Sequence, residues 1–307
     1  MVDTLLARTY VIKVAIEDDK GDYNTPDLDL LCFDLKCDPV TENEARQGTG
    51  KFEADNNVGV FTSEKGKCSF RTELLGSGAG ALDPALSALL QACNFKLTTS
   101  TYTAPVSNYT DKKTISIAAY QSGKLKMMSG CSGTCIISCE AMGKPASIQF
   151  DFTGKWLGET DADLPASWTP SAQKPMKFTG FTIDTPAAKV SRYELDLGIA
   201  VEPQPDPNGT GGVACYLAHA DSIIVSFDPE SQLVGTWDVD GARQSQATLA
   251  LVATFSNGID KLVVTNAKGE ILENPAAARN KLLVNQIKCR ALLTSGDDNV
   301  SMVVSAA

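Results

Sequence analysis

Residues 147–153 read SIQFDFT, a run in which polar and apolar side chains strictly alternate. Ile148, Phe150 and Phe152 fall on one face of an extended chain, while Gln149 and Asp151 fall on the other. This period of two is typical of a β-strand with one face in the core. The same rhythm recurs in residues 114–120, 191–201, 222–227, 247–255 and 281–293. The sequence therefore predicts a mainly β protein built from half-buried antiparallel strands.

Dipeptides that favour tight turns separate these runs. They are Ser122-Gly123, Asn257-Gly258 and Lys268-Gly269. Glycine after a small or polar residue supplies the positive φ that hairpin turns need. We expect each of the three to connect two neighbouring strands.

One segment carries a helical pattern instead. Asp83 is a suitable N-cap, and Pro84 fits the first helical position. Leu86, Leu89, Leu90 and Cys93 then recur at the spacing of one helix face, and Asn94 can end the helix. The pattern predicts a short helix flanking the strands at residues 83–94.

The segment before this helix, residues 76–80, reads GSGAG and superficially resembles a phosphate-binding loop. It lacks the Gly-Lys-Ser/Thr ending of such loops, and the spacing of dinucleotide-binding glycines also fails. We interpret it as a bending connector.

Composition narrows the class of protein. Of the 307 residues, 43% are hydrophobic and 21% are charged, which is ordinary for a globular chain. Asp3, Arg8 and Lys13 interrupt the apolar pattern of the first twenty residues, so we expect no signal peptide and folding in a cytoplasm. The net charge of −10 argues against a protein that grips nucleic acid, since such proteins present stripes of Lys and Arg.

The nine cysteines are an odd number, which argues against a disulfide framework in a cytoplasmic chain. Cys131, Cys135 and Cys139 are the closest set, but their spacing differs from the usual zinc motifs, and His219 is the single histidine. We expect small buried thiols, with no metal site and no cofactor.

No catalytic template fits. His219 is not accompanied by a Gly-x-Ser-x-Gly motif. Acidic pairs such as Asp18-Asp19 and Asp297-Asp298 lie in apparent turns, where solvated loop charges are expected. We therefore predict that the protein is not an enzyme.

The chain also has a weak internal repeat. The polar loops 40–59 and 202–212 each contain Gly-Thr-Gly, and each precedes a strand with Ser-Phe, at Ser69-Phe70 and Ser226-Phe227. We interpret this as a duplication, with chance similarity of two β domains as the alternative. The expected organisation is an N-terminal arm or entry strand at 1–29, β domains at 30–155 and 178–307, and a linker at 156–177.

Several stretches together resemble one family, the tail tube (major tail) proteins of long-tailed bacteriophages. Residues 73–95 are similar to its glycine-rich connector, proline and short helix, and residues 130–154 to its closing pair of strands. Residues 22–26 resemble its entry turn. In the second half, residues 195–198, 226–230 and 295–304 also match, so the resemblance covers about residues 8–305. The cysteines at 131, 135 and 139 depart from it.

The resemblance implies two tandem antiparallel β-sandwich or barrel domains and a structural role in the virion. Such subunits polymerise into stacked rings around a tape measure protein, between tail terminator and distal tail proteins, and form the conduit for the genome. DNA would pass through an acidic bore without specific binding, and no membrane is involved. The alternative is a phage decoration protein or a carbohydrate-binding β-sandwich, which would bind its ligand through exposed aromatic residues.

The resemblance also prompts hypotheses about assembly. Candidate contacts between rings are Tyr10, Ile12 and Val14 in the N-terminal stretch and Glu42, Glu44 and Arg46 in the long loop. The N-terminal stretch fits equally well as an ordinary first strand. If each half is one tube domain, three chains supply six domains, and a trimeric ring with pseudo-six-fold shape is expected. Six chains per ring is the alternative.

Overall fold

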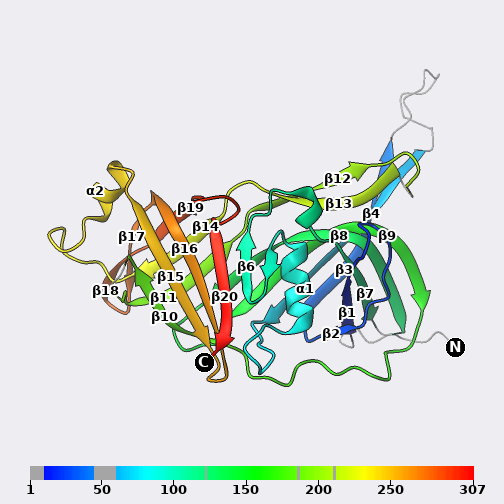
Figure 1. Cartoon of the computed structure of the whole chain (residues 1–307), viewed down its shortest axis with the longest axis horizontal. Coiled ribbons are helices and arrows are strands. Elements are labelled where there is room, and N and C mark those ends of the chain that lie inside the picture. The colour runs from blue at the N-terminus through cyan, green and yellow to red at the C-terminus, as the bar shows by residue number, and fades with distance from the viewer. Residues whose placement is uncertain (1–9, 45–59, 122, 185–186, 210–211) are drawn as a thin grey trace, which may run out of the picture.

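The computed structural model describes residues 10–44, 60–121, 123–184, 187–209 and 212–307, with the side chains of 42–44 and 60–63 excepted. Antiparallel strands account for most of these residues, together with two α-helices (Figure 1). The predicted mainly β sandwich fold is confirmed. Neither helix in the described ranges is long and apolar enough to cross a membrane.

Six strands of the first half are hydrogen-bonded in the order β1-β7-β8-β9-β4-β3, and all pairs are antiparallel. In this order their bounds are Tyr10–Ile16, Ile115–Gln121, Lys124–Cys139, Ser147–Asp161, Val60–Glu73 and Phe33–Glu44.

Six strands of the second half repeat this arrangement as β10-β15-β16-β19-β14-β11, again antiparallel throughout. Their bounds are Lys177–Ile183, Thr248–Ser256, Asp260–Glu273, Ile287–Ala291, Ile224–Pro229 and Val190–Asp196. Each strand of one series thus has a counterpart in the other: β1 with β10, β7 with β15, β8 with β16, β9 with β19, β4 with β14 and β3 with β11. The two halves share one topology.

The halves are joined edge to edge. β8 pairs with β11 over four residues, from Ile136 opposite Asp196 to Cys139 opposite Tyr193. This joint creates a continuous eight-stranded path, β3-β4-β9-β8-β11-β14-β19-β16. The path contains the same four-strand order twice in tandem.

Helix α1 (Pro84–Ala92) follows β4 along the chain, as predicted. The Asp83 carboxylate caps it by accepting hydrogen bonds from the N–H groups of Ala85 and Leu86, and Asn94 takes a φ of 67° just after it. The shorter α2 (Val239–Gln244) follows β14, the counterpart of β4. The helix position is therefore repeated in both halves, in a diverged form.

The other elements pair with strands of these two series or form separate hairpins. β2 pairs with β1, β20 pairs with β16, the β5–β6 hairpin pairs with β20, and β12–β13 and β17–β18 form separate hairpins. With the 3₁₀ helix η1, their bounds are β2 Leu28–Leu30, β5 Lys96–Thr98, β6 Thr101–Ala104, η1 Tyr109–Asp111, β12 Ile199–Pro205, β13 Val213–Ala220, β17 Ala276–Arg279, β18 Leu282–Asn285 and β20 Val300–Ala306.

Some local expectations were wrong. Lys268-Gly269 lies inside β16, where a shift in register shows a β-bulge instead of a turn. The predicted linker at 156–177 overlaps β9, which runs to Asp161. Most of the loop predicted at 202–212 is the β12–β13 hairpin. The domain boundaries themselves stay a prediction.

Aromatic side chains fill the interior of each half. In the first, the rings of Phe70, Phe150 and Phe152 lie with centroids 5.6–6.1 Å apart. In the second, five buried rings contact one another: Phe178, Phe181, Tyr193, Phe227 and Phe255. On the opposite side of these strands the side chains are exposed, as Gln149 and Asp151 on β9 are, and we call this side the uncovered face.

The glycine-rich segment has an unexpected partner, the carboxylate of Asp260 at the start of β16. Asp260 is 0% exposed, and its oxygens accept hydrogen bonds from Gly78 N (2.8 Å) and Gly80 N (2.7 Å). Consecutive backbone N–H groups in such loops make concave anion sites. Here the anion belongs to the other half of the same chain, so the segment fastens the two halves together.

We predict that Asp260→Asn lowers the free energy of unfolding by about 1.5–3 kcal/mol, because a hydrogen bond to a buried charged group is lost. Gly76→Ala should act likewise, since its Cβ would lie 2.1 Å from Asp260 Oδ2. Urea titration followed by circular dichroism measures both. The control is Asp221→Asn at an exposed position. Equal stability of D260N and D221N would contradict a stabilising role for the contact between Asp260 and the glycine-rich segment, which we call the Asp260 clasp.

Candidate functional site

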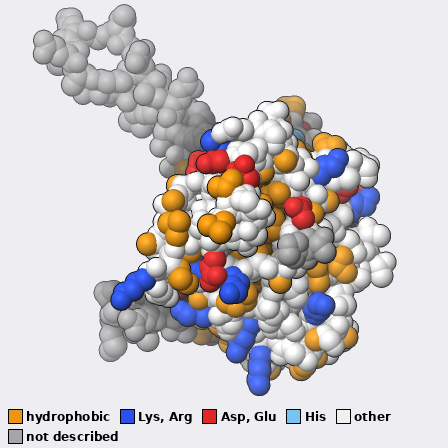
Figure 2. Space-filling model, turned by 90° about the vertical axis from the view of Figure 1, so that its left-hand side faces the viewer, with side chains coloured by type: hydrophobic (Ala, Val, Ile, Leu, Met, Phe, Trp, Pro, Cys, Tyr) orange, Lys and Arg blue, Asp and Glu red, His pale blue; other side chains and the backbone are white. Residues whose placement is uncertain are grey.

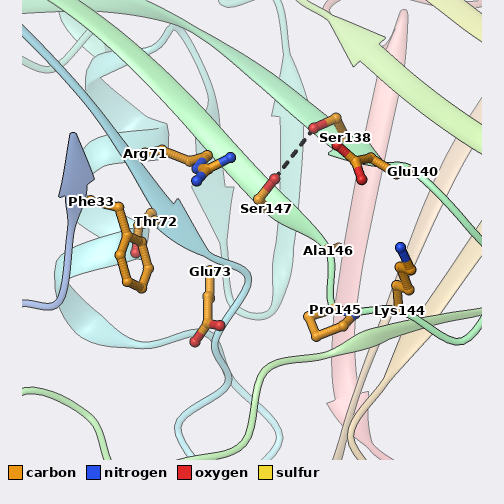
Figure 3. Close-up of a pocket in the computed structure, with 10 residues that line it drawn as sticks. All are labelled: Phe33, Arg71, Thr72, Glu73, Ser138, Glu140, Lys144, Pro145, Ala146 and Ser147. Atoms are coloured by element: carbon orange, nitrogen blue, oxygen red, sulfur yellow. Dashed lines mark hydrogen bonds between the residues drawn. The ribbon is translucent and has the colours of Figure 1, made fainter.

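Among the described residues, the pocket in Figure 3 is a polar hollow of about 280 Å³ on the uncovered face of the first half. Arg71, Glu73, Glu140 and Lys144 line it, and the hydroxyl groups of Ser138 and Ser147 lie 3.4 Å apart between β8 and β9. A second hollow, of about 260 Å³, is lined from the counterpart strands β11, β14, β16 and β19. The two hollows are a further trace of the repeat.

A larger hollow of about 450 Å³ lies beside α2, between Lys189, Glu230 and Trp237. Figure 2 shows the end of the molecule that carries α2 and the β17–β18 hairpin, where apolar side chains are scattered among charged ones. Exposed apolar residues at this end are Leu233, Val234, Leu282 and Leu283. The end combines apolar surface with the β17–β18 hairpin.

The uncovered face of the eight-stranded path is polar and carries both charges. Arg290 on β19 pairs with Glu270 on β16 (2.6 Å), and Lys288 pairs with Glu273 between the same strands (3.0 Å). On β9 and β4 the exposed positions include Gln149, Asp151, Lys67 and Arg71. Cationic and anionic groups are therefore interspersed on this face.

The structure locates the residues proposed from sequence for contacts between rings. Ile12 and Val14 are 0% exposed in the core, because β1 pairs with β7 as an ordinary strand of the first half. They are corrected to core residues. The half-buried Tyr10 accepts a hydrogen bond from Asp34 N through its hydroxyl group.

Two of the other candidates, Glu42 and Glu44, lie at the end of β3 that the structure describes. The backbone of Glu42 and Glu44 is paired in β3, opposite Ser63 and Val60. Arg46 lies outside the described residues, as does most of the predicted loop 40–59. The proposal that this loop reaches an adjacent ring stays a prediction.

All nine cysteines are free and buried, as expected from the sequence. Cys37 lies opposite Cys68 across β3 and β4, and the hydrogen bond that the Cys68 thiol shares with Cys37, together with burial, raises the pKa of Cys68. Burial raises the pKa of Cys32 and of Cys289 to about 12. No group of three metal-ligating side chains occurs in the described ranges. His219 is exposed, with its Nδ1 3.5 Å from Lys112 Nζ.

Sequence reasoning missed the feature that best defines a site, the pair of strand edges at the two ends of the eight-stranded path. β3 ends it at one side. At the other, β16 is itself paired with β15 and β20, so among the described residues the open edge is that of its extension β17. The Ala-Ala-Ala-Arg sequence of β17 has no alternation that could have revealed it. No protein-family model matches the chain, and no curated protein matches it.

The buried thiols predict a dependence of stability on alkaline pH. A thiol with a raised pKa in the folded chain stabilises the fold below its ordinary value of 9.0 and loses this contribution as the pH rises toward about 12. The urea midpoint should therefore fall across that window. Cys32→Ala/Cys289→Ala should show a shallower fall, and an equal slope in both proteins would refute the assignment.

Proposed function

We propose that this chain is the subunit of a bacteriophage tail tube, a virion structural protein that polymerises into stacked rings and conducts the genome. The observation that carries the proposal is the tandem eight-stranded path: two halves of equal topology, joined through β8 and β11. A contact that joins one half to the next can also join one chain to the next. The sequence resemblance to tail tube proteins supports the same conclusion.

The joint is heterologous, because it uses different edges of the two halves. A heterologous contact, when repeated between copies, gives either a closed ring or an open filament. Three chains would place six halves around an axis, which gives a trimeric ring of pseudo-six-fold shape. A ring of six chains is the alternative.

We assign the uncovered face of the path to the bore. The opposite face is closed by the buried aromatic rings and α1, so the polar face is the one free to meet water and DNA. Its charges are paired across strands, as in Arg290 with Glu270. The proposed lining is therefore mixed in charge, in place of the acidic bore expected from the resemblance. Paired charges leave little net positive field to hold phosphates.

The remaining parts of the proposal follow the resemblance. The partners are further copies of this chain, a tape measure protein inside the tube, and tail terminator and distal tail proteins at its ends. The subunit is expected in the virion tail after assembly in a host cytoplasm, with no catalytic role.

Electron microscopy of the purified protein tests the proposal. Negative staining should show rings or hollow tubes at high protein concentration or in the presence of the tape measure protein. A species that stays monomeric in all these conditions would count against a tube subunit. A monomer that binds glycans on an array would favour the alternative decoration or carbohydrate-binding role.

A further inference from the structure

The joint inside the chain defines a contact geometry residue by residue. On β8, Ile137, Ser138 and Cys139 lie opposite Leu195, Glu194 and Tyr193 of β11. This segment of β8 is the far end of the β8–β9 hairpin, close to its turn. The first half thus presents a hairpin end, and the second half presents its edge strand β11.

The β17–β18 hairpin is the counterpart of that hairpin end in the second half. Glu273 of β16 lies opposite Lys288 of β19, and three positions further along both strands Ala276 lies opposite Asn285. Gln286 N also donates to Pro275 O (2.8 Å) between these two pairs. From the Glu273–Lys288 pair onward, β16–β17 and β18–β19 therefore form one hairpin in a single register, as β8–β9 does from Ser132 to Ser138.

The strand pairings within each half show which residues of the first half correspond to which residues of the second. Phe70 pairs with Phe150 and Phe227 with Ile287, so Phe150 corresponds to Ile287. Two positions earlier along the chain, Ile148 corresponds to Asn285. Ile148 pairs with Ile137 of β8, and Asn285 pairs with Ala276 of β17, so Ile137 corresponds to Ala276. Ser138 and Cys139 then correspond to Ala277 and Ala278.

The edge strands β3 and β11 also correspond residue by residue. Lys36 of β3 pairs with Ser69, and Glu194 of β11 pairs with Ser226. Lys36 therefore corresponds to Glu194, and its neighbours Leu35 and Cys37 correspond to Tyr193 and Leu195. Residues 35–37 of β3 therefore occupy the positions through which residues 193–195 of β11 pair with β8.

In this chain the outer edge of β17 is open. Arg279 and Leu282 flank a two-residue turn whose residues Asn280 and Lys281 both have positive φ, and such a flanking pair exchanges both hydrogen bonds. Hydrogen-bonded and non-hydrogen-bonded pairs alternate along an antiparallel ladder. The backbone N–H and C=O groups of Ala276 and Ala278 therefore point away from β18. Both are exposed, whereas their counterparts Ile137 and Cys139 are buried.

The hairpin is also held in place for docking. Arg279 donates to the Asp228 carboxylate (2.6 Å) and to the Asp228 carbonyl (3.1 Å), which ties β17 to β14. Along the described part of β3, the outer edge has no strand partner, and Lys36 is exposed. A preorganised edge loses little entropy when another strand adds to it.

The β12–β13 hairpin and its counterpart in the first half have different surroundings. The β12–β13 hairpin of the second half packs against β8 of the first half, with Gly130 beside Cys215 and the Tyr109 hydroxyl donating to Gln204 Oε1 (3.1 Å). In Figure 1 its counterpart, the described end of the β3–β4 hairpin, projects from the body of the chain. The β12–β13 hairpin thus packs on the other half of its own chain. The described end of the β3–β4 hairpin has no such packing within the chain and could contact a second copy.

We infer that a second copy of this chain adds its β3 edge to β17, in the register of the internal joint. Leu35, Lys36 and Cys37 of one copy then lie opposite Ala278, Ala277 and Ala276 of the next. This inference deepens the proposed function, because it names the surfaces that join chains within a ring.

Engineered disulfides test the register. Lys36 and Ala277 would form a non-hydrogen-bonded pair, in which Cα atoms lie about 4.5 Å apart, within the range of a disulfide. Lys36→Cys/Ala277→Cys should give covalent multimers after oxidation by copper–phenanthroline, seen on a non-reducing gel. The nine native cysteines are buried and supply a low background. Ser138→Cys/Glu194→Cys, across the internal joint, is the positive control and should form its disulfide within one chain.

Mixing the single variants tests the heterologous character. K36C alone and A277C alone should not cross-link with themselves, and their mixture should give dimers with no higher species. Self-cross-linking of either single variant would overturn the inference, since it indicates a two-fold contact. Ala278→Pro provides a cysteine-free check: it removes an outward N–H at an edge position that tolerates proline. It should abolish assembly while leaving the circular dichroism spectrum and thermal midpoint of the monomer unchanged.

The outcomes separate this inference from the proposed function. Tubes that form from K36C/A277C without covalent multimers, or from A278P at the wild-type level, would overturn the β3–β17 contact and leave the tube proposal standing. Absence of both tubes and multimers in wild-type and variant proteins would overturn both.

Discussion

The antiparallel ladder between β8 and β11 is the interaction on which the rest of the structure depends. Every strand has two hydrogen-bonding edges, and an unpaired edge is open to further strands. The ladder satisfies one edge of each half and thereby turns two similar halves into one continuous path. Since the same topology occurs twice, the path starts with one kind of edge and ends with the other. The asymmetry of its two ends is what makes the molecule suited to repetition.

Other features secure the relation between the halves. The Asp260 carboxylate sits in the glycine-rich segment, and the β12–β13 hairpin lies along β8. Together with the β8–β11 ladder and the pairing of β20 with β6, they fix one half against the other. In the proposed ring, the angle between successive halves would determine whether repetition closes. The buried thiols and aromatic rings fill the interior behind this framework and leave the outer face to polar groups.

Much of this was predictable from local patterns. The alternation in SIQFDFT identified β9, and Asp83 with Pro84 identified α1, because burial periodicity and capping are local in sequence. Lys268-Gly269 misled, since glycine serves a bulge as well as a turn. Ile12 and Val14 could not be separated from surface residues, because alternation does not say which partner covers the apolar face. The Asp260 clasp joins groups 180 and 182 residues apart, and no local signal predicts such a contact.

The central claim is that one chain provides two equivalent units of a closed ring. A three-dimensional electron microscopy map of the assembled particle, reconstructed with three-fold symmetry, tests it most directly. The account predicts three chains per ring, with six lobes that alternate between the two halves and with β17 of each chain beside β3 of the next. Six copies of the whole chain around the axis would contradict it.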